Sequence, residues 1–191
     1  MSLLHDAVKN NNINQLQILL DMGYDLNEKD EHGRNLLFTA ASHNSIKAAA
    51  LLIKSGGDVN ARDKKGETPL YEAVRYNFIE SAVLLINSGA DVNAYDEFKQ
   101  TSLFHAVWVN SKAIAALLIN SGAEVNARNE DGETPLHEAV RGNFTEISAL
   151  LINSGADVNA RDNNGKTPLV MAIANENNEI VKLLKKAGAK E

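Results

Sequence analysis

Apolar residues recur along the chain in clusters that share one spacing. A run of three, such as Leu51-Leu52-Ile53, returns at a constant interval in five copies, and a glycine follows each run three positions later. An apolar cluster bounded by a glycine predicts a helix that ends there. The evenly spaced glycines of this ladder are Gly23, Gly56, Gly89, Gly122, Gly155 and Gly188. Because no insertion breaks the register, the chain is predicted to consist of 33-residue repeats.

A first, shorter helix is predicted within each repeat by Thr-Pro-Leu strings, which begin at Thr68, Thr134 and Thr167. The threonine hydroxyl can cap the helix, and proline suits the first helical position. An asparagine that can adopt the left-handed, helix-ending conformation follows nine residues after each threonine position, and only Glu176 departs from this. The asparagines are Asn11, Asn44, Asn77, Asn110 and Asn143.

A pair of short helices cannot bury both of its faces, so stability must come from stacking neighbouring repeats. The sequence therefore predicts an all-α solenoid of helix-turn-helix units with hairpin loops between them, forming a single domain over residues 1–191. In the last helix, Lys182, Lys185 and Lys186 give the polar outer face that a terminal repeat needs. We expect a monomer.

The strings inside the repeats resemble the ankyrin repeat family. Residues 129–140 read NEDGETPLHEAV, and residues 152–160 read INSGADVNA, and both are similar to motifs of that family. The resemblance covers essentially the whole chain and implies β-hairpin loops joining stacked helix pairs. The six repeats are placed near residues 1–29, 30–62, 63–95, 96–128, 129–161 and 162–191.

An internal duplication shows which positions have changed. Repeats three and five share more residues with each other than neighbouring repeats do, so we infer that a pair of adjacent repeats was duplicated as one segment. Repeat four carries Tyr95, Glu97, Phe98, Gln100, Trp108 and Val109 at positions that the resemblance places on the binding side. The matching residues of repeat two are Lys29, Glu31, His32, Arg34, Ser42 and His43, so four of the six positions have become apolar or aromatic.

Composition and charge narrow the class of protein. The chain has no cysteine, which excludes thiolate catalysis and a disulfide framework, and with no signal-like N-terminus this predicts an intracellular, cytoplasmic protein or one that acts in a host cytosol. No apolar run is long enough for a membrane span. A formal net charge of −6 argues against sequence-independent nucleic-acid binding.

Catalytic and metal-binding motifs are absent from the sequence. There is no Gly-x-Ser-x-Gly, phosphate loop or His-Glu-x-x-His string, so we expect a non-enzymatic protein without a cofactor or metal. His5 and His137 occupy the family's Thr-Pro-Leu-His position, where the resemblance implies that they hold neighbouring loops. The aspartates that start turns are predicted to accept backbone N–H groups. They are Asp30, Asp63, Asp96 and Asp162.

The resemblance places binding in a concave groove formed by the hairpin tips and the exposed side of the first helices. We expect a protein or peptide partner with apolar anchors and acidic flanks to bind there. The predicted contact residues are Tyr76, Tyr95, Phe98, Trp108, Val109, Arg62, Arg75, Arg128, Arg141 and Arg161.

Three alternatives to this prediction stay open. Trp108 could instead cover a gap in the irregular repeat four, where Lys99 replaces a turn glycine. The arginines could be surface residues paired with Glu67, Glu130 or Glu133. Aromatic rings beside arginines could also bind a nucleotide or another small anionic ligand, which would make the chain a ligand sensor.

Overall fold

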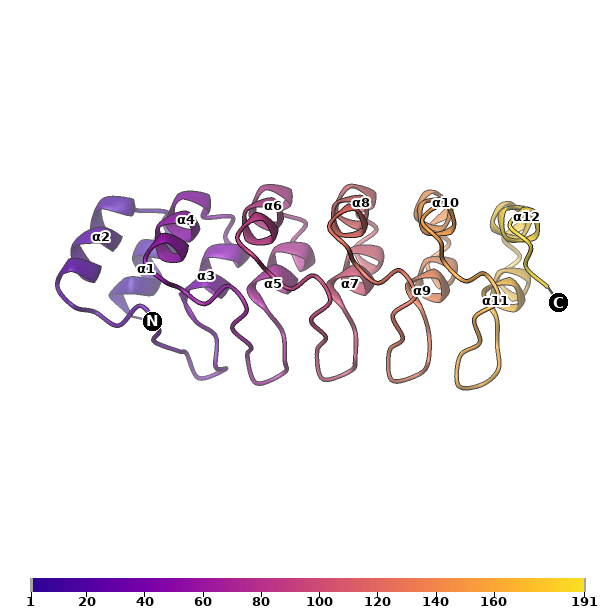
Figure 1. Ribbon diagram of the computed structural model, residues 1–191, viewed down its shortest axis with the longest axis horizontal. Coiled ribbons are helices and arrows are strands. Elements are labelled where there is room, and N and C mark those ends of the chain that lie inside the picture. Colours follow the sequence, from indigo (N-terminus) through magenta and orange to yellow (C-terminus); the bar gives the residue numbers. More distant parts are fainter. Residues whose placement is uncertain (1, 191) are drawn as a thin grey trace. The chain divides into compact units, whose positions relative to one another are not determined.

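The structure is a computed structural model that describes residues 2–190, and within them it contains twelve α-helices and no strand. The chain divides into two compact units, Met1–Glu97 with six helices and Phe98–Glu191 with the other six (Figure 1). The first helices of the repeats are α1 (Leu3–Lys9), α3 (Leu36–Ser42), α5 (Pro69–Arg75), α7 (Ser102–Trp108), α9 (Pro135–Arg141) and α11 (Pro168–Ala174). The second helices are α2 (Ile13–Asp21), α4 (Ile46–Lys54), α6 (Ile79–Asn87), α8 (Lys112–Asn120), α10 (Thr145–Asn153) and α12 (Asn178–Lys186).

The first helix of a repeat begins and ends as its sequence predicts. Thr68 is in an extended conformation, and its hydroxyl oxygen accepts a hydrogen bond from the backbone N–H of Tyr71 at 3.3 Å. Pro69 then occupies the first turn, where its missing N–H costs nothing. Two residues after the helix ends, Asn77 has a φ of 57°, the left-handed conformation that stops a helix. The four other asparagines at this position, and Glu176, also have a positive φ.

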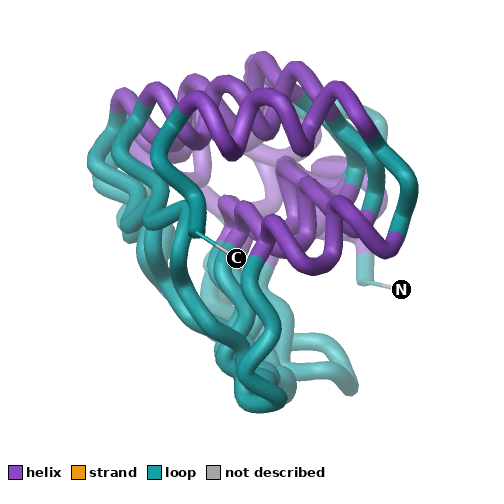
Figure 2. The backbone as a smooth tube through the Cα atoms, turned by 90° about the vertical axis from the view of Figure 1, so that its right-hand side faces the viewer, coloured by secondary structure: helices purple, strands orange, loops and turns teal. Residues whose placement is uncertain are grey.

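Two layers of helices form the core of each unit. In the first unit α1, α3 and α5 pack side by side, as do α2, α4 and α6, and the second unit repeats this arrangement (Figure 2). One alanine in each first helix is fully buried, which lets neighbouring helices approach closely. These alanines, which occupy the same position in every repeat, are Ala7, Ala40, Ala73, Ala106, Ala139 and Ala172.

The hairpin loops are joined to one another by backbone hydrogen bonds. In the first unit the N–H of Lys64 donates to the carbonyl oxygen of His32 at 2.9 Å, and in the second unit the N–H of Asn163 donates to that of Asp131 at 2.9 Å. The loops consist of tight turns, and Tyr95 and Thr101 form isolated bridges rather than strands. Each loop is therefore held to its neighbour within a unit, which gives its side chains a fixed position.

Polar side chains complete the loops. Asp63 accepts hydrogen bonds from the backbone N–H groups of Lys65 and Glu67 at 2.8 and 3.0 Å, which confirms the structural role predicted for this aspartate. Asn60 donates to the carbonyl oxygen of Gly89 and accepts from the N–H of Asp91 in the next repeat. The prediction that all six repeats make a single domain stays a prediction.

Candidate functional site

The predicted aromatic residues lie on the surface of both units. Tyr76 and Tyr95 in the first unit are 49% and 57% exposed, and Phe98 and Trp108 in the second are 55% and 63% exposed. Val109, which directly follows α7, is half-buried. Exposed aromatic side chains are candidates for contacts with a partner, because tyrosine and tryptophan are enriched among interface anchors.

The two tyrosines of the first unit are each covered by an arginine. The guanidinium of Arg62 lies 5.3 Å from the centre of the Tyr95 ring, and that of Arg75 lies 5.7 Å from the centre of the Tyr76 ring. Tyr76 also stacks on Phe78, with ring centres 6.0 Å apart. These contacts hold the tyrosine rings in place while about half of each side chain stays exposed.

Trp108 is the last residue of α7 and lies at the surface of repeat four. Its ring meets the buried ring of His105 edge-on, with centres 6.1 Å apart, and remains largely exposed. Together with Gln100, Phe104 and Glu138 it lines a cavity of about 150 Å³. The irregular turn of this repeat is nevertheless formed, because Lys99 takes a φ of 58° in place of glycine.

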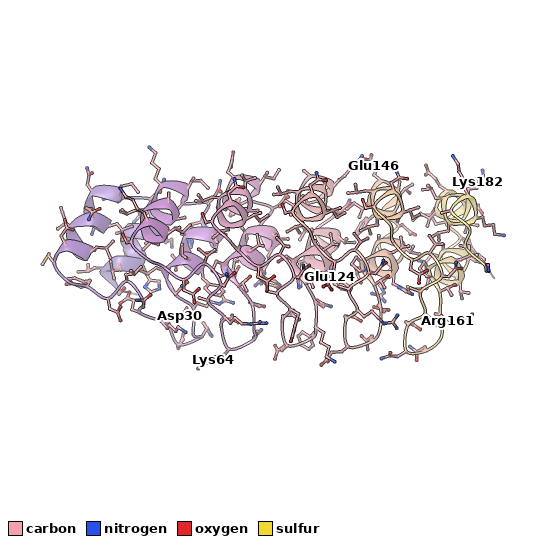
Figure 3. All side chains as sticks on the ribbon, viewed as in Figure 1. Asp30, Lys64, Glu124, Glu146, Arg161 and Lys182 are labelled. Atoms are coloured by element: carbon pink, nitrogen blue, oxygen red, sulfur yellow. The ribbon has the colours of Figure 1, made fainter. Side chains whose placement is uncertain are left out.

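The hairpin arginines bond to the backbone of the loops. Arg62 donates to the carbonyl oxygen of Tyr95, Arg128 to that of Arg161 at 2.6 Å, and Arg161 to that of Gly165 at 2.9 Å. Arg161 lies on a hairpin loop, as does Lys64, whereas Glu146 and Lys182 lie on second helices (Figure 3). Part of the role of these arginines is therefore to support the loops.

Arg141 fits the alternative in which the arginines pair with glutamates of the chain itself, because it contacts two carboxylates of its own unit. Its Nη2 donates to Glu133 and its Nη1 to Glu138. Burial lowers the pKa of Arg141, but the bonds to these carboxylates and their charges outweigh burial and leave the pKa raised. Arg141 is thus permanently charged and neutralises one of two neighbouring carboxylates.

A buried charge cluster in the first unit was not predicted from the sequence. Arg34 lies between three carboxylates: its Nε is 3.1 Å from Asp63, its Nη2 is 3.0 Å from Glu67, and its Nη1 is 3.0 Å from Glu72. The same guanidinium lies over the ring of Phe38, 5.8 Å from its centre. The arginine comes from one hairpin and the carboxylates from the next hairpin and α5, so only the folded chain brings them together.

Burial gives Glu72 the most perturbed environment of this cluster. The residue is 1% exposed, and its Oε2 atom has no hydrogen-bond partner within the described part of the chain. Desolvation raises its pKa, although the charges of Arg34 and Arg75 oppose the shift. The duplication could have pointed to this cluster. Two repeats later, the positions of Arg34 and Asp63 are both occupied by neutral residues, Gln100 and Asn129, so the two charges change together.

A wide hollow in the first unit has a mostly cationic lining. Its volume is about 550 Å³, and Lys64, Lys65 and Arg75 line it beside the ring of Tyr76. His32, Arg34 and Asp63 complete the wall. The hollow therefore combines an aromatic face with an excess of positive charge.

Two of the five histidines, His5 and His137, have structural surroundings. His137 is fully buried, its Nδ1 accepts from the backbone N–H of Thr134 at 3.1 Å, and its Nε2 is 3.2 Å from the carbonyl oxygen of Lys166 in the next hairpin. Burial lowers the pKa of His137, so it is neutral at pH 7. His5 is held by Ser2 and Glu28. These contacts confirm that both histidines hold neighbouring segments.

Within residues 2–190 no group of histidine and acidic side chains has the geometry of a metal site. No helix in the same range is both long enough and apolar enough to cross a membrane.

Stacked pairs of short helices with hairpin loops define the chain as a helical repeat protein. A family model for ankyrin repeats in three copies matches residues 4–96 and again 103–191, and the chain belongs to the ankyrin repeat family. A crystal structure of an ankyrin repeat domain from Acinetobacter baumannii is 34% identical, with a TM-score of 0.90 over 98% of each chain. No curated protein matches the chain significantly. The fold is thus an all-α ankyrin repeat solenoid, and proteins of this family generally mediate protein interactions.

Proposed function

We propose that the chain is a non-enzymatic protein-interaction module that binds a protein or peptide through the hairpin and first-helix side of its repeats. The observation that carries this proposal is the exposure of Tyr76, Tyr95, Phe98 and Trp108, each of which is about half exposed or more. Tryptophan and tyrosine are the side chains that most often anchor a protein interface, because they bury a large area at a small entropic cost.

The arginines and Val109 are proposed as secondary contacts around these rings. A guanidinium has five N–H donors, and the hydrogen bonds of Arg62, Arg128, Arg161 and Arg141 within the chain engage one or two of them. The remaining donors suit carboxylates of a partner. The hollow beside Tyr76, with Lys64, Lys65 and Arg75 in its wall, supports an acidic segment as one part of that partner.

The experiment compares partner capture by the wild-type chain and by the double variant Trp108→Ala, Phe98→Ala. We expect the variant to lose one specific protein, with an affinity at least about 30-fold lower once that protein is purified, which is the loss typical of interface anchors. Ile18→Ala, Met22→Ala is the matched control, because these side chains are equally exposed but lie on or beside α2. Equal affinity of the two double variants would refute the proposed surface.

The cationic hollow also supports the second candidate, binding of a nucleotide or another small anion. An aromatic ring beside lysines can stack on a base and hold its phosphates. Phosphate binding weakens steeply as salt rises, so titration with adenosine and guanosine triphosphate at about 50 and 200 mM salt tests this candidate. Loss of binding in Lys64→Ala, Lys65→Ala would support it, and an absence of binding at low salt would eliminate it.

A further inference from the structure

The cavity beside Trp108 differs in charge from the hollow of the first unit. Trp108 supplies an exposed aromatic ring, Glu138 supplies a carboxylate, and Gln100 supplies a neutral amide, whereas Phe104 is 2% exposed and contributes little surface. A cavity of about 150 Å³ can hold a planar group of the size of a benzene ring. The lining therefore suits a flat cation rather than an anion.

The duplication shows which group occupies the equivalent place in the first unit. Gln100, Phe104 and Glu138 lie two repeats after Arg34, Phe38 and Glu72, at the same positions. In the first unit the guanidinium of Arg34 lies over the Phe38 ring and 3.0 Å from Glu72. The chain thus fills one copy of this arrangement with its own arginine, and in the other copy the shorter Gln100 leaves a cavity.

The second copy carries fewer charged groups than the first but the same net charge, because an arginine and an aspartate are lost together. Arg34 and Asp63 correspond to the neutral Gln100 and Asn129, so the second copy lacks one charge of either sign. Glu133 and Glu138 remain, and the single cation Arg141 bonds to both. Arg141 engages Oε2 of Glu138, and the Glu138 side chain is 20% exposed, so part of this carboxylate is accessible.

We propose that this cavity binds an arginine side chain of a protein partner, an inference that rests on the proposed interaction function. The guanidinium lies against the exposed ring of Trp108 and donates to the carboxylate of Glu138, as Arg34 does to Glu72. Arginine fits better than lysine because a guanidinium is flat, stacks on aromatic rings and is weakly hydrated. Trp108, which has Ser42 as its counterpart in the first unit, supplies an aromatic wall that the first copy lacks.

The test is a titration with three blocked tripeptides, Gly-Arg-Gly, Gly-Lys-Gly and Gly-Leu-Gly. Trp108 is the only tryptophan, so its fluorescence and its indole N–H resonance report on this cavity alone. We expect the arginine peptide to shift both signals with a Kd on the order of 1 mM, about tenfold tighter than the lysine peptide. The leucine peptide should shift neither signal.

Gln100→Arg is the decisive variant, because it supplies the guanidinium that the first unit already contains. We expect it to fold, to melt at or above the wild-type temperature, and to bind the arginine peptide at least tenfold more weakly. Gln17→Arg, on exposed α2, adds the same charge elsewhere and should leave binding unchanged. Glu138→Gln should weaken binding about tenfold without changing the response to the leucine peptide.

Equal binding of the arginine and lysine peptides, or unchanged binding by Gln100→Arg, would overturn the proposal. The captured partner separates this failure from failure of the proposed function. A partner lost by Trp108→Ala, Phe98→Ala but kept by Gln100→Arg would leave the interaction surface standing and refute the arginine pocket. A partner that also depends on Gln100 and on one of its own arginines would support both.

Discussion

Arg34 is a partly exposed residue whose loss should nevertheless destabilise the first unit strongly. Its side chain is 28% exposed, whereas those of Asp63 and Glu72 are 1% exposed, so its removal leaves buried carboxylates without a counter-charge. We expect Arg34→Gln to lower the free energy of unfolding by about 3 kcal/mol. Urea denaturation measures the loss.

The duplication supplies the matched rescue. In the second unit Gln100 and Asn129 occupy the positions of Arg34 and Asp63. The double variant Arg34→Gln, Asp63→Asn therefore gives the first unit the same residues at these two positions. We expect the double variant to be at least about 1 kcal/mol more stable than Arg34→Gln, because one buried charge is gone. Strict additivity of Arg34→Gln and Asp63→Asn would show that these two side chains are not coupled.

Glu72 makes the effect of Arg34 dependent on pH. Its pKa is raised by burial, and Arg34 opposes that rise, so the pKa of Glu72 should be higher still in Arg34→Gln. Between the unfolded and folded pKa values the folded state then binds more protons, and its stability increases as pH falls. The stability gap between wild type and Arg34→Gln should therefore narrow between pH 7 and about pH 5. When Glu72→Gln is introduced into both the wild type and Arg34→Gln, the difference in their stability should no longer depend on pH in this range.

At the scale of the element, the hairpin of repeat four contains a correctable defect. Lys99 has a φ of 58° at a position that is glycine in four other hairpins, and its side chain is exposed. We expect Lys99→Gly to stabilise the chain by roughly 1 kcal/mol, because glycine adopts this conformation without a steric cost. Lys65→Gly is the control, since Lys65 has no positive φ, and it should destabilise. Thermal and urea unfolding report the sign of each change.

The helices were predictable because each repeat contains its own helix-starting and helix-ending residues. Threonine, proline and asparagine at fixed spacings determine where the first helix begins and ends, and the left-handed conformations of Asn77, Lys99 and Glu176 follow the positions expected of them. The exposure of Trp108 agrees with the side of the repeat on which the family resemblance placed it. These inferences needed only residues within one repeat or in equivalent positions.

The charge cluster and the cavity needed the stacked structure. Arg34 contacts carboxylates that are 29 to 38 positions away in the sequence. From its own turn alone, Asp63 is predicted only to accept backbone N–H groups. The cavity likewise joins α7 to Glu138 of α9. A sequence comparison can detect the paired loss of Arg34 and Asp63, but only the distances show that these residues share one site.

At the scale of the whole molecule, the prediction of a single domain can be tested with the natural tryptophan. Trp108 lies in the second compact unit, whereas far-ultraviolet circular dichroism reports on the helices of both. Repeats gain their stability from neighbours, so coupled repeats unfold together when their interfaces are strong. We expect the two urea transitions to coincide in midpoint and slope. A fluorescence transition at a different urea concentration would mean that the units unfold separately.

A destabilising change in the other unit makes this test sharper. Arg34→Gln alters only the first unit directly, and its residue is distant in sequence from Trp108. If all six repeats form one cooperative domain, this variant lowers the midpoint of the Trp108 transition by the same amount as that of the helical signal. If the units are independent, the Trp108 midpoint stays at its wild-type value while the helical signal splits into two steps. Only the first result is consistent with a single domain. In a cooperative domain, a loss of stability in one repeat lowers the unfolding midpoint reported by Trp108 in another repeat.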